Sequence, residues 1–283
     1  MSNYKDKIVY RRKHKTILKY LEKKYDYVIK SFDPQEPSSI PQKNIVWTMW
    51  WQDEQPDMVK MCLHSISANF KDYTITFITK RNYTDYIELP DYVLSKVDSG
   101  DISITHLSDI IRWKLLRKYG GFWLDATTLI KNTISGKALI KNDKLRYWTT
   151  RLPEKEYVCI SRYRWNCAEM YMHQNYLLAR FIDTFLTEYL KHEPRFIDYF
   201  LTDFLTDIVY RKFKVYRDDL KKIEFVNQNF YFIDGFLNEL YSESAYQSLV
   251  GDMFKLNRRW NVQPSKEMKL TMFGYLLQKF SKS

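Results

Sequence analysis

The chain has few of the residues on which several common sites are built. Only seven glycines occur in 283 residues, and neither GxGxxG nor GxxxxGK[ST] is present, so a glycine-rich phosphate loop is excluded. The three cysteines include no CxxC pair, and their odd number argues against a disulfide framework. The five histidines show no HxxxH or HExxH spacing, which leaves a zinc site little support. These absences favour a reducing, cytoplasmic setting.

Long apolar runs are also missing. No uninterrupted run approaches the roughly 18 residues that a membrane span requires, and the basic N-terminus lacks the apolar core of a signal peptide. With 45% hydrophobic and 17% aromatic residues, the chain can instead bury a large core. The net charge of +11 indicates a polyanionic or membrane-surface partner, or else serves solubility alone.

Both ends of the sequence have the pattern of a basic amphipathic helix. Residues 1–31 carry ten Lys or Arg against three Asp or Glu, with apolar residues at 18, 21, 25 and 28. Residues 266–280 repeat this spacing, again with lysines alongside. Docking on the protein and lying on a membrane surface remain equally open for both segments. Prolines within 33–42 predict a boundary.

Between these ends, apolar runs alternate with helical periodicity. Residues 44–51 and 73–79 have the pattern of buried strands, and the segment between them that of a helix. A second helix is predicted over 108–119 and a strand over 122–130, and the pattern turns helical from about 168 to 215. The order strand, helix, strand predicts an α/β sheet with parallel neighbours.

The helix predicted over 108–119 places two charged residues on its apolar side. On a helical wheel Arg112 lies near the middle of the apolar arc and Asp109 within it, three residues away. Three other cations, Lys114, Arg117 and Lys118, fall on the opposite face, which is expected to meet water. Because buried charges cost several kcal/mol unless paired, Asp109 and Arg112 form either a structural ion pair or part of a ligand site.

The following residues favour the ligand site. Gly120 and Gly121 suit the C-terminus of a helix, and the short strand after them ends at Asp125. In open α/β sheets, ligands bind at the carboxyl ends of the strands. In a chain without a glycine-rich loop, a diphosphate held by a divalent cation and basic side chains is consistent with this pattern.

The segment SDIIRWKLLRKYGGFWLDAT (108–127) resembles the SD-[IL]-x-R…YGG-[IVF]-[YW]-[IL]-D signature of GT-A glycosyltransferases of the DxD type, related to glycosyltransferase family 32. The bacterial capsular polysaccharide synthesis family is the closer resemblance, supported by IVWTMWWQ, YIELPDYV and FKLNRRW. This resemblance, over roughly 40–260, implies a GT-A-like (Rossmann-like) α/β fold, a central mixed sheet flanked by helices. The predicted parts are a basic helix and linker (1–40), the glycosyltransferase domain (41–262) and a C-terminal helix (263–283).

The resemblance also implies roles for particular residues. Asp109 and Arg112 would help hold the nucleotide sugar, and Asp125 would serve the ribose and a divalent cation, Mn²⁺ or Mg²⁺. The second carboxylate of a DxD motif would fall at position 127, where this chain has Thr127. A hydroxyl is a poor substitute for a carboxylate on these ions, so direct metal coordination is in doubt.

Five further positions have both a functional and a structural interpretation. Trp50, Trp51 and Gln52 end the first predicted strand, where uracil could stack and hydrogen-bond, although for either tryptophan alone a place in the core is the favoured interpretation. Asp203 matches a carboxylate after the family's YFL-type segment and is a second catalytic candidate, or an exposed helix aspartate. Lys255 could neutralise a departing diphosphate, or be a surface lysine.

The resemblance implies a glycosyltransferase that moves a hexose from a UDP-sugar to a sugar hydroxyl of a polysaccharide or lipid-linked acceptor, with retention of configuration expected from the related enzymes. It would work in the cytoplasm, peripherally on the inner face of the membrane, without nucleic acid. Two alternatives remain open: a membrane-associated scaffold that lost activity through Thr127, and a nucleic-acid-binding protein. The oligomeric state is not predicted.

Overall fold

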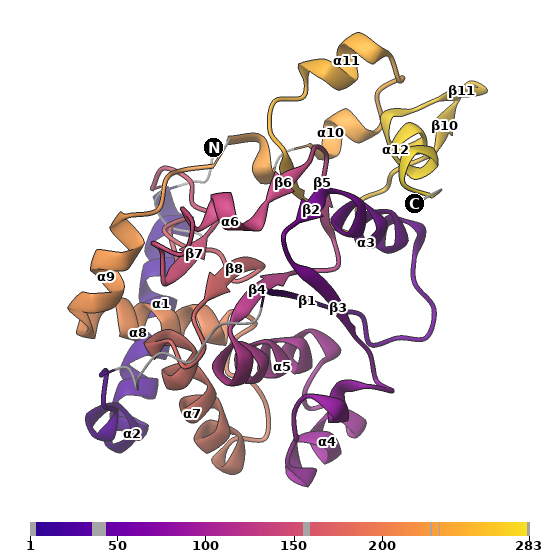
Figure 1. The fold of residues 1–283 in the computed structure, drawn as a ribbon. Helices are drawn as coiled ribbons and strands as arrows, with labels where there is room; N and C mark the ends of the chain where they lie inside the picture. The colour runs from indigo at the N-terminus through magenta and orange to yellow at the C-terminus, as the bar shows by residue number, and fades with distance from the viewer. Residues whose placement is uncertain (1–3, 36–43, 155–158, 227, 232, 282–283) are drawn as a thin grey trace. The chain divides into compact units, whose positions relative to one another are not determined.

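The computed structural model describes residues 4–35, 44–154, 159–226, 228–231 and 233–281; most of the boundary predicted at 33–42 lies outside them. The chain forms two compact units, each built from three separate segments. Figure 1 labels their helices and strands. Unit 1 comprises Met1–Lys43, Arg81–Trp123 and Leu145–Glu224, and unit 2 comprises Asn44–Lys80, Leu124–Lys144 and Phe225–Ser283. The three-part division expected from the sequence stays a prediction.

Unit 1 is mainly helical. Its elements are α1 (Tyr4–Lys24), α2 (Asp26–Ser31), η1 (Tyr83–Asp85), α4 (Asp91–Asp98), α5 (Ile104–Tyr119), most of β4 (Gly121–Leu124), β7 (Tyr147–Thr149), β8 (Glu169–Met172), α7 (Leu177–His192), α8 (Leu201–Lys212) and α9 (Lys214–Lys221).

Unit 2 combines short strands with helices. Its elements are β1 (Ile45–Met49), α3 (Asp57–Asn69), β2 (Phe70–Lys71), β3 (Thr74–Ile78), β5 (Thr128–Ile130), β6 (Ile134–Ser135), α6 (Gly136–Leu139), η2 (Gln228–Tyr231), α10 (Asp234–Leu237), α11 (Glu243–Ser248), β9 (Met253–Lys255), β10 (Ser265–Lys266), β11 (Lys269–Leu270) and α12 (Met272–Phe280).

The strand pairs confirm the predicted α/β class with a central mixed sheet and flanking helices. In unit 2, β1 and β3 are parallel, with Ile45 opposite Thr74, and α3 connects them through the chain. In unit 1, β7 and β8 are antiparallel. The helical expectation for 168–215 is therefore wrong at its start, because β8 is a four-residue buried strand. So short an apolar run has no periodicity that separates strand from helix.

Helix α5 follows the predicted wheel on its apolar side. Ser103 caps its N-terminus by accepting a hydrogen bond from the His106 amide, and Gly120, at φ 66°, ends it. The expectation that three cations meet water holds for Arg117 and Lys118 but is wrong for Lys114, whose side chain is only 19% exposed. Lys114 and Arg117 both pair with Asp183 of α7, at 3.1 and 2.8 Å. Packing of α5 on α7 therefore supplies an anion that the wheel does not show.

The strand predicted over 122–130 is two strands separated by a turn. The Thr128 amide donates to the Asp125 carbonyl oxygen at 2.9 Å, which closes a β-turn with aspartate at its first position, where aspartate is favoured. After the turn, β5 pairs antiparallel with β9, with Thr128 opposite Lys255. The turn therefore brings a segment from far along the chain beside Asp125.

Helix α12 packs within unit 2. Met272, Phe273, Leu276 and Phe280 are buried and share a hydrophobic cluster with Met58 and Cys62 of α3. The helix begins later than predicted: Thr271 caps it, and the preceding residues form the β10–β11 hairpin. Most of its apolar side is thus buried in the protein.

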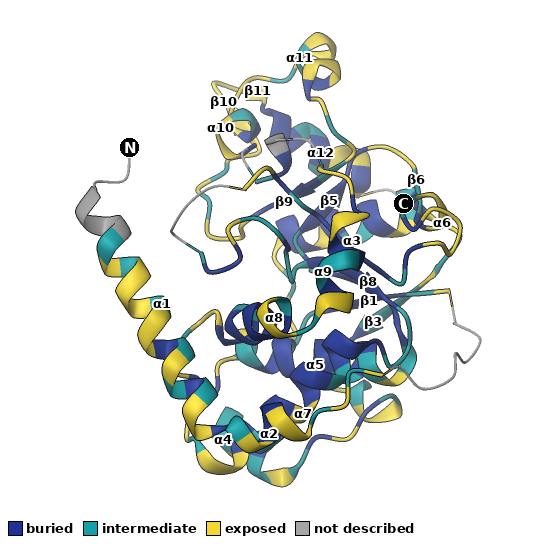
Figure 2. Cartoon of the chain, turned by 90° about the vertical axis from the view of Figure 1, so that its left-hand side faces the viewer, coloured by how far each residue is buried: buried dark blue, intermediate teal, exposed yellow. Residues whose placement is uncertain are grey.

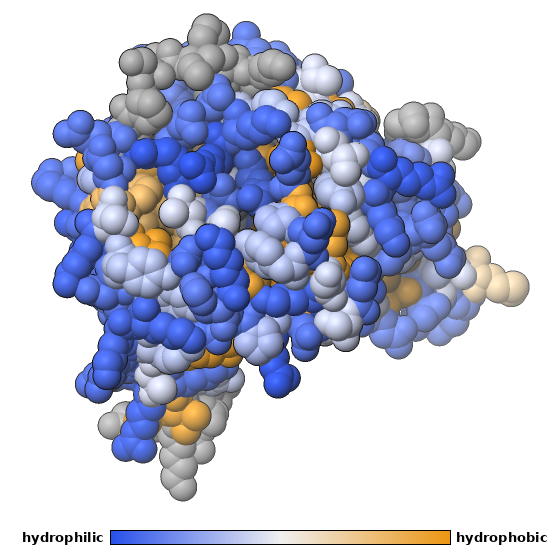
Figure 3. All heavy atoms as spheres, turned by 90° about the horizontal axis from the view of Figure 1, so that it is seen from below, coloured by the Kyte–Doolittle hydropathy of each residue, from blue (hydrophilic) through white to orange (hydrophobic). Residues whose placement is uncertain are grey.

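Helix α1 is buried along one part of its length. Ile17 and Leu21 are buried, and Lys24 and Tyr20 bind Glu193, whereas residues 8–16 include no buried side chain. Figure 2 shows the exposed stretch of α1 and the buried residues of α5. Among the described residues, no helix is long and apolar enough to cross a membrane. The face drawn in Figure 3 is mostly hydrophilic.

Candidate functional site

In unit 1, α5 brings Asp109 and Arg112 together as predicted. The Arg112 Nη1 lies 3.2 Å from the Asp109 Oδ1, and the guanidinium carbon lies 4.8 Å from the centre of the Trp123 ring in β4. The two residues are only 8% and 6% exposed. At this depth the pair has the surroundings of a structural ion pair, and a ligand could reach only a small part of it.

Asp203 lies in the same unit on α8 and is not a freely solvated helix aspartate. Its Oδ1 accepts a hydrogen bond from the Trp165 ring nitrogen at 2.9 Å, and the Cys167 Sγ lies 3.9 Å away. Desolvation raises the pKa of Asp203 to about 6, although the Trp165 hydrogen bond and the charge of Arg112 oppose the rise. A carboxyl group that titrates near neutrality is suited to proton transfer.

In unit 2, the turn after β4 carries Asp125 and Thr127, and β9 supplies Lys255. The Lys255 Nζ donates to the Thr127 Oγ1 and lies 3.4 Å from the Asp125 Oδ2. The side chains of Lys255 and Asp125 keep 19% and 26% exposure. The structure therefore places a carboxylate, a hydroxyl and an ammonium group together where solvent reaches them.

A divalent cation does not fit this set of residues. Asp125 is its one carboxylate, and Lys255 already binds both Thr127 and Asp125. Mg²⁺ and Mn²⁺ favour several oxygen ligands. Among the described residues, no group of three or more His, Cys, Asp or Glu side chains is arranged to hold a metal.

The residues after β1 are partly exposed, so they are not core tryptophans. The Trp50 ring nitrogen donates to the Glu54 carbonyl oxygen at 2.9 Å, and the Arg258 guanidinium lies 5.8 Å from the Trp50 ring centre. Trp51 is half-buried and Gln52 is exposed. Trp47, inside β1, is the buried tryptophan of this segment.

Sequence reasoning missed three residues of these surroundings: Trp165, Cys167 and Arg258. Arg258 stands in the FKLNRRW segment, where a second cation close to Lys255 was a usable signal. Trp165 and Cys167 contact Asp203 from 38 and 36 residues away, and nothing local in the sequence indicates this contact.

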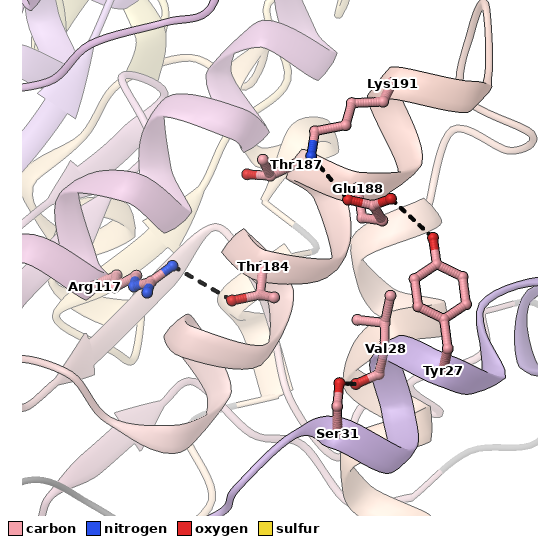
Figure 4. Close-up of a pocket in the computed structure, with 8 residues that line it drawn as sticks. All are labelled: Tyr27, Val28, Ser31, Arg117, Thr184, Thr187, Glu188 and Lys191. Atoms are coloured by element: carbon pink, nitrogen blue, oxygen red, sulfur yellow. Dashed lines mark hydrogen bonds and ion pairs between the residues drawn. The ribbon is translucent and has the colours of Figure 1, made fainter.

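A surface pocket of about 390 Å³ lies elsewhere in unit 1, beside α2 and α7 (Figure 4). Its charged groups are already compensated. Glu188 accepts hydrogen bonds from Lys191 and Tyr27, and Arg117 pairs with Asp183. The pocket contains none of the predicted site residues.

The comparisons with known proteins agree with the resemblance of the α5–β4 segment. The capsular polysaccharide synthesis protein family matches residues 1–276, and the chain belongs to this family. No curated protein matches the chain.

Several solved glycosyltransferase structures are similar. PaToxG glycosyltransferase has a TM-score of 0.43 and 12% identity over 76% of this chain and 84% of its own. The apo form of GlyE from Streptococcus pneumoniae TIGR4 has a TM-score of 0.44 and 9% identity over 86% of this chain, which spans 61% of the GlyE chain. The galactosyltransferase LgtC, in complex with donor and acceptor sugar analogs, has a TM-score of 0.37 and 10% identity over 84% of this chain and 94% of its own.

Proposed function

We propose that the chain is a GT-A-type glycosyltransferase that transfers a hexose from a UDP-sugar to a sugar hydroxyl during capsular polysaccharide synthesis. The observation that carries this proposal is the contact of Asp125, Thr127 and Lys255 at the turn after β4. It presents a cation and hydrogen-bonding oxygens at a strand end, the position where α/β proteins bind ligands. Family membership supplies the biological process.

The residues of unit 2 would act on the nucleotide. As the bond from the anomeric carbon to the diphosphate breaks, negative charge builds on the departing UDP, and the Lys255 ammonium would stabilise it. Asp125 would position the donor through its ribose. Trp50 and Trp51 offer partly exposed rings on which uracil can stack, and Gln52 offers an amide for its edge.

The residues of unit 1 would act on the sugars. Asp203, with its raised pKa, would orient or deprotonate a hydroxyl of the acceptor or bind the donor sugar. Asp109 and Arg112 are part of the proposal as residues that help hold the nucleotide sugar. Transfer with retention of configuration and a lipid-linked acceptor are part of the proposal, as is peripheral contact with the inner membrane face.

Donor hydrolysis tests the proposal. Release of UDP from a panel of UDP-hexoses is measured for the wild type and for Asp125→Ala. We expect the wild type to turn over at least one donor and Asp125→Ala to lose roughly 100-fold or more, because charge-positioning groups contribute on this scale. Lys269→Ala, in the exposed β10–β11 hairpin, serves as the control.

Donor hydrolysis, liposome binding and a mobility-shift assay together distinguish the proposal from its two alternatives. Equal turnover by wild type and Asp125→Ala would remove the catalytic assignment. Binding to liposomes without UDP release would favour the inactive scaffold. A salt-dependent mobility shift of DNA or RNA would favour the nucleic-acid-binding protein.

A further inference from the structure

We propose that Lys255 is the resident counter-ion for the donor diphosphate, so that this chain binds its nucleotide without a divalent cation. This inference rests on the proposed function and deepens it. A lysine ammonium donates three hydrogen bonds. Here it contacts Thr127, Asp125 and the Leu256 carbonyl oxygen, the last two at 3.4 and 3.3 Å.

The backbone fixes the place of this ammonium group. Lys255 is the last residue of β9 and stands opposite Thr128 of β5. On the turn side of this pair, the Leu256 amide donates to the Thr127 carbonyl oxygen, and the Thr128 amide donates to the Asp125 carbonyl oxygen, both at 2.9 Å. Cross-strand bonds and the turn therefore hold both strand ends in one register.

Packing beneath the ladder makes the position rigid. Leu129, Ile130, Phe254 and Leu256 are fully or almost fully buried in unit 2, so neither β5 nor β9 can slide without exposing apolar surface. Lys255 itself keeps 19% side-chain exposure. The result is a preplaced cation that solvent reaches, and a diphosphate oxygen would replace one of its two longer contacts, to Asp125 or to the Leu256 carbonyl oxygen.

The Lys255 ammonium group disfavours a metal ion at this place, through competition for the same oxygens and through charge repulsion. A divalent cation bound between Asp125 and Thr127 would use the oxygens that Lys255 already contacts and would be repelled by the ammonium charge at close range. The position where a DxD motif would provide a second carboxylate holds Thr127, whose hydroxyl accepts from Lys255. The neutral residue at position 127 and the ammonium group beside it both disfavour a divalent cation.

Binding of UDP alone tests the inference without depending on catalysis. Calorimetric titrations of the full chain with UDP are run in EDTA and in millimolar Mn²⁺. We expect equal affinities within roughly threefold, and a loss of roughly 10-fold or more in Lys255→Ala, because a hydrogen bond to a charged group contributes on this scale. Lys255→Arg should keep most of the affinity, since it keeps the charge.

Two controls make the result specific. Lys269→Ala, another lysine of unit 2 but exposed on the hairpin, should bind UDP as the wild type does. Thermal unfolding of each variant shows whether Lys255→Ala is folded, and the wild-type titrations decide the metal question even if it is not. A requirement for Mn²⁺ in the wild type, or wild-type affinity in a folded Lys255→Ala, would overturn the inference alone. Absence of UDP binding under every condition would overturn the proposed function with it.

Discussion

Asp203 and Asp207 lie one turn apart on α8 but have opposite surroundings. Asp207 pairs with Arg164 at 3.0 Å and with Arg211 at 2.8 Å. Asp203 instead meets a tryptophan ring nitrogen and a thiol, and its pKa is raised to about 6. Asp207 therefore has the partners of a structural anion, whereas Asp203 is a carboxyl group whose charge is held at a cost.

The raised pKa of Asp203 makes its contribution to stability depend on pH. Below the ordinary value of 3.8 the carboxyl is protonated in both states; above about 6 it is ionised in both, and the folded state carries the full desolvation cost. Stability is therefore lost as pH rises through this window. Asp203→Asn should be more stable than the wild type, with a gain that grows by roughly 1 kcal/mol between about pH 5 and about pH 7.5.

Urea unfolding at the two pH values measures this gain, with Asp207→Asn as the matched control. That control should lose roughly 1–3 kcal/mol at both pH values, because it removes the buried anion of the largely buried Arg164, which keeps only the exposed Glu154 at 3.5 Å. A constant difference between Asp203→Asn and the wild type across this pH range would contradict the raised pKa. If Asp203 also serves catalysis, UDP release by the wild type should fall below about pH 6, and Asp203→Asn should lack this decline.

At the scale of elements, the close packing of α12 against Pro264 requires a glycine at position 274. A Cβ built on Gly274 would lie 1.9 Å from the Pro264 carbonyl oxygen, which is a clash with backbone that no rotamer relieves. We expect Gly274→Ala to destabilise unit 2 by roughly 1–3 kcal/mol, the usual cost of overpacking.

Gly235→Ala in α10 is the matched control, since a Cβ there meets nothing within 4 Å. Its unfolding midpoint should equal that of the wild type or exceed it slightly, as alanine is favoured in helices. Equal midpoints for both variants would mean that α12 does not approach Pro264 so closely.

The elements also show which parts of the fold hydrophobic periodicity predicts. Apolar periodicity was sufficient for α5, because its buried stripe is continuous from Leu107 to Leu116. It failed at Lys114, which is largely covered, and it did not show that Lys114 and Arg117 share Asp183 of another helix. It also joined β4 to β5, because the hydrogen bond that closes the turn at Asp125 has no signal in hydrophobicity.

At the scale of the whole molecule, each unit is assembled from three separate segments. The end of the chain is therefore part of a core. Removal of residues 263–283 would take four buried side chains from the cluster shared with α3: Met272, Phe273, Leu276 and Phe280. At roughly 1.5–3 kcal/mol for each buried side chain, the loss is comparable to the total stability of a typical domain.

We therefore expect the truncated chain to lose the fold of unit 2, and with it UDP binding. Limited proteolysis and near-ultraviolet circular dichroism would measure this loss. Met268→Ser, at a fully exposed hairpin position, is the control that changes the same region without touching the core. Protease resistance of the truncated chain equal to that of the wild type would show that α12 is a separable addition.

The sequence by itself determined the α/β class, through the order of strand and helix patterns along the chain. It also determined the buried stripe of α5 and the meeting of Asp109 with Arg112, since both depend on periodicity within one segment. It also indicated Asp125, Thr127 and Lys255 as candidates, through their resemblance to a family. Only the tertiary structure decided that Lys255 contacts Thr127 and Asp125, 128 residues or more away. It also decided that Trp165 donates to Asp203 and that burial raises the pKa of this carboxyl group. The reason is physical: strand pairing and burial set distances and pKa values among residues far apart in the chain, and no local pattern carries those quantities.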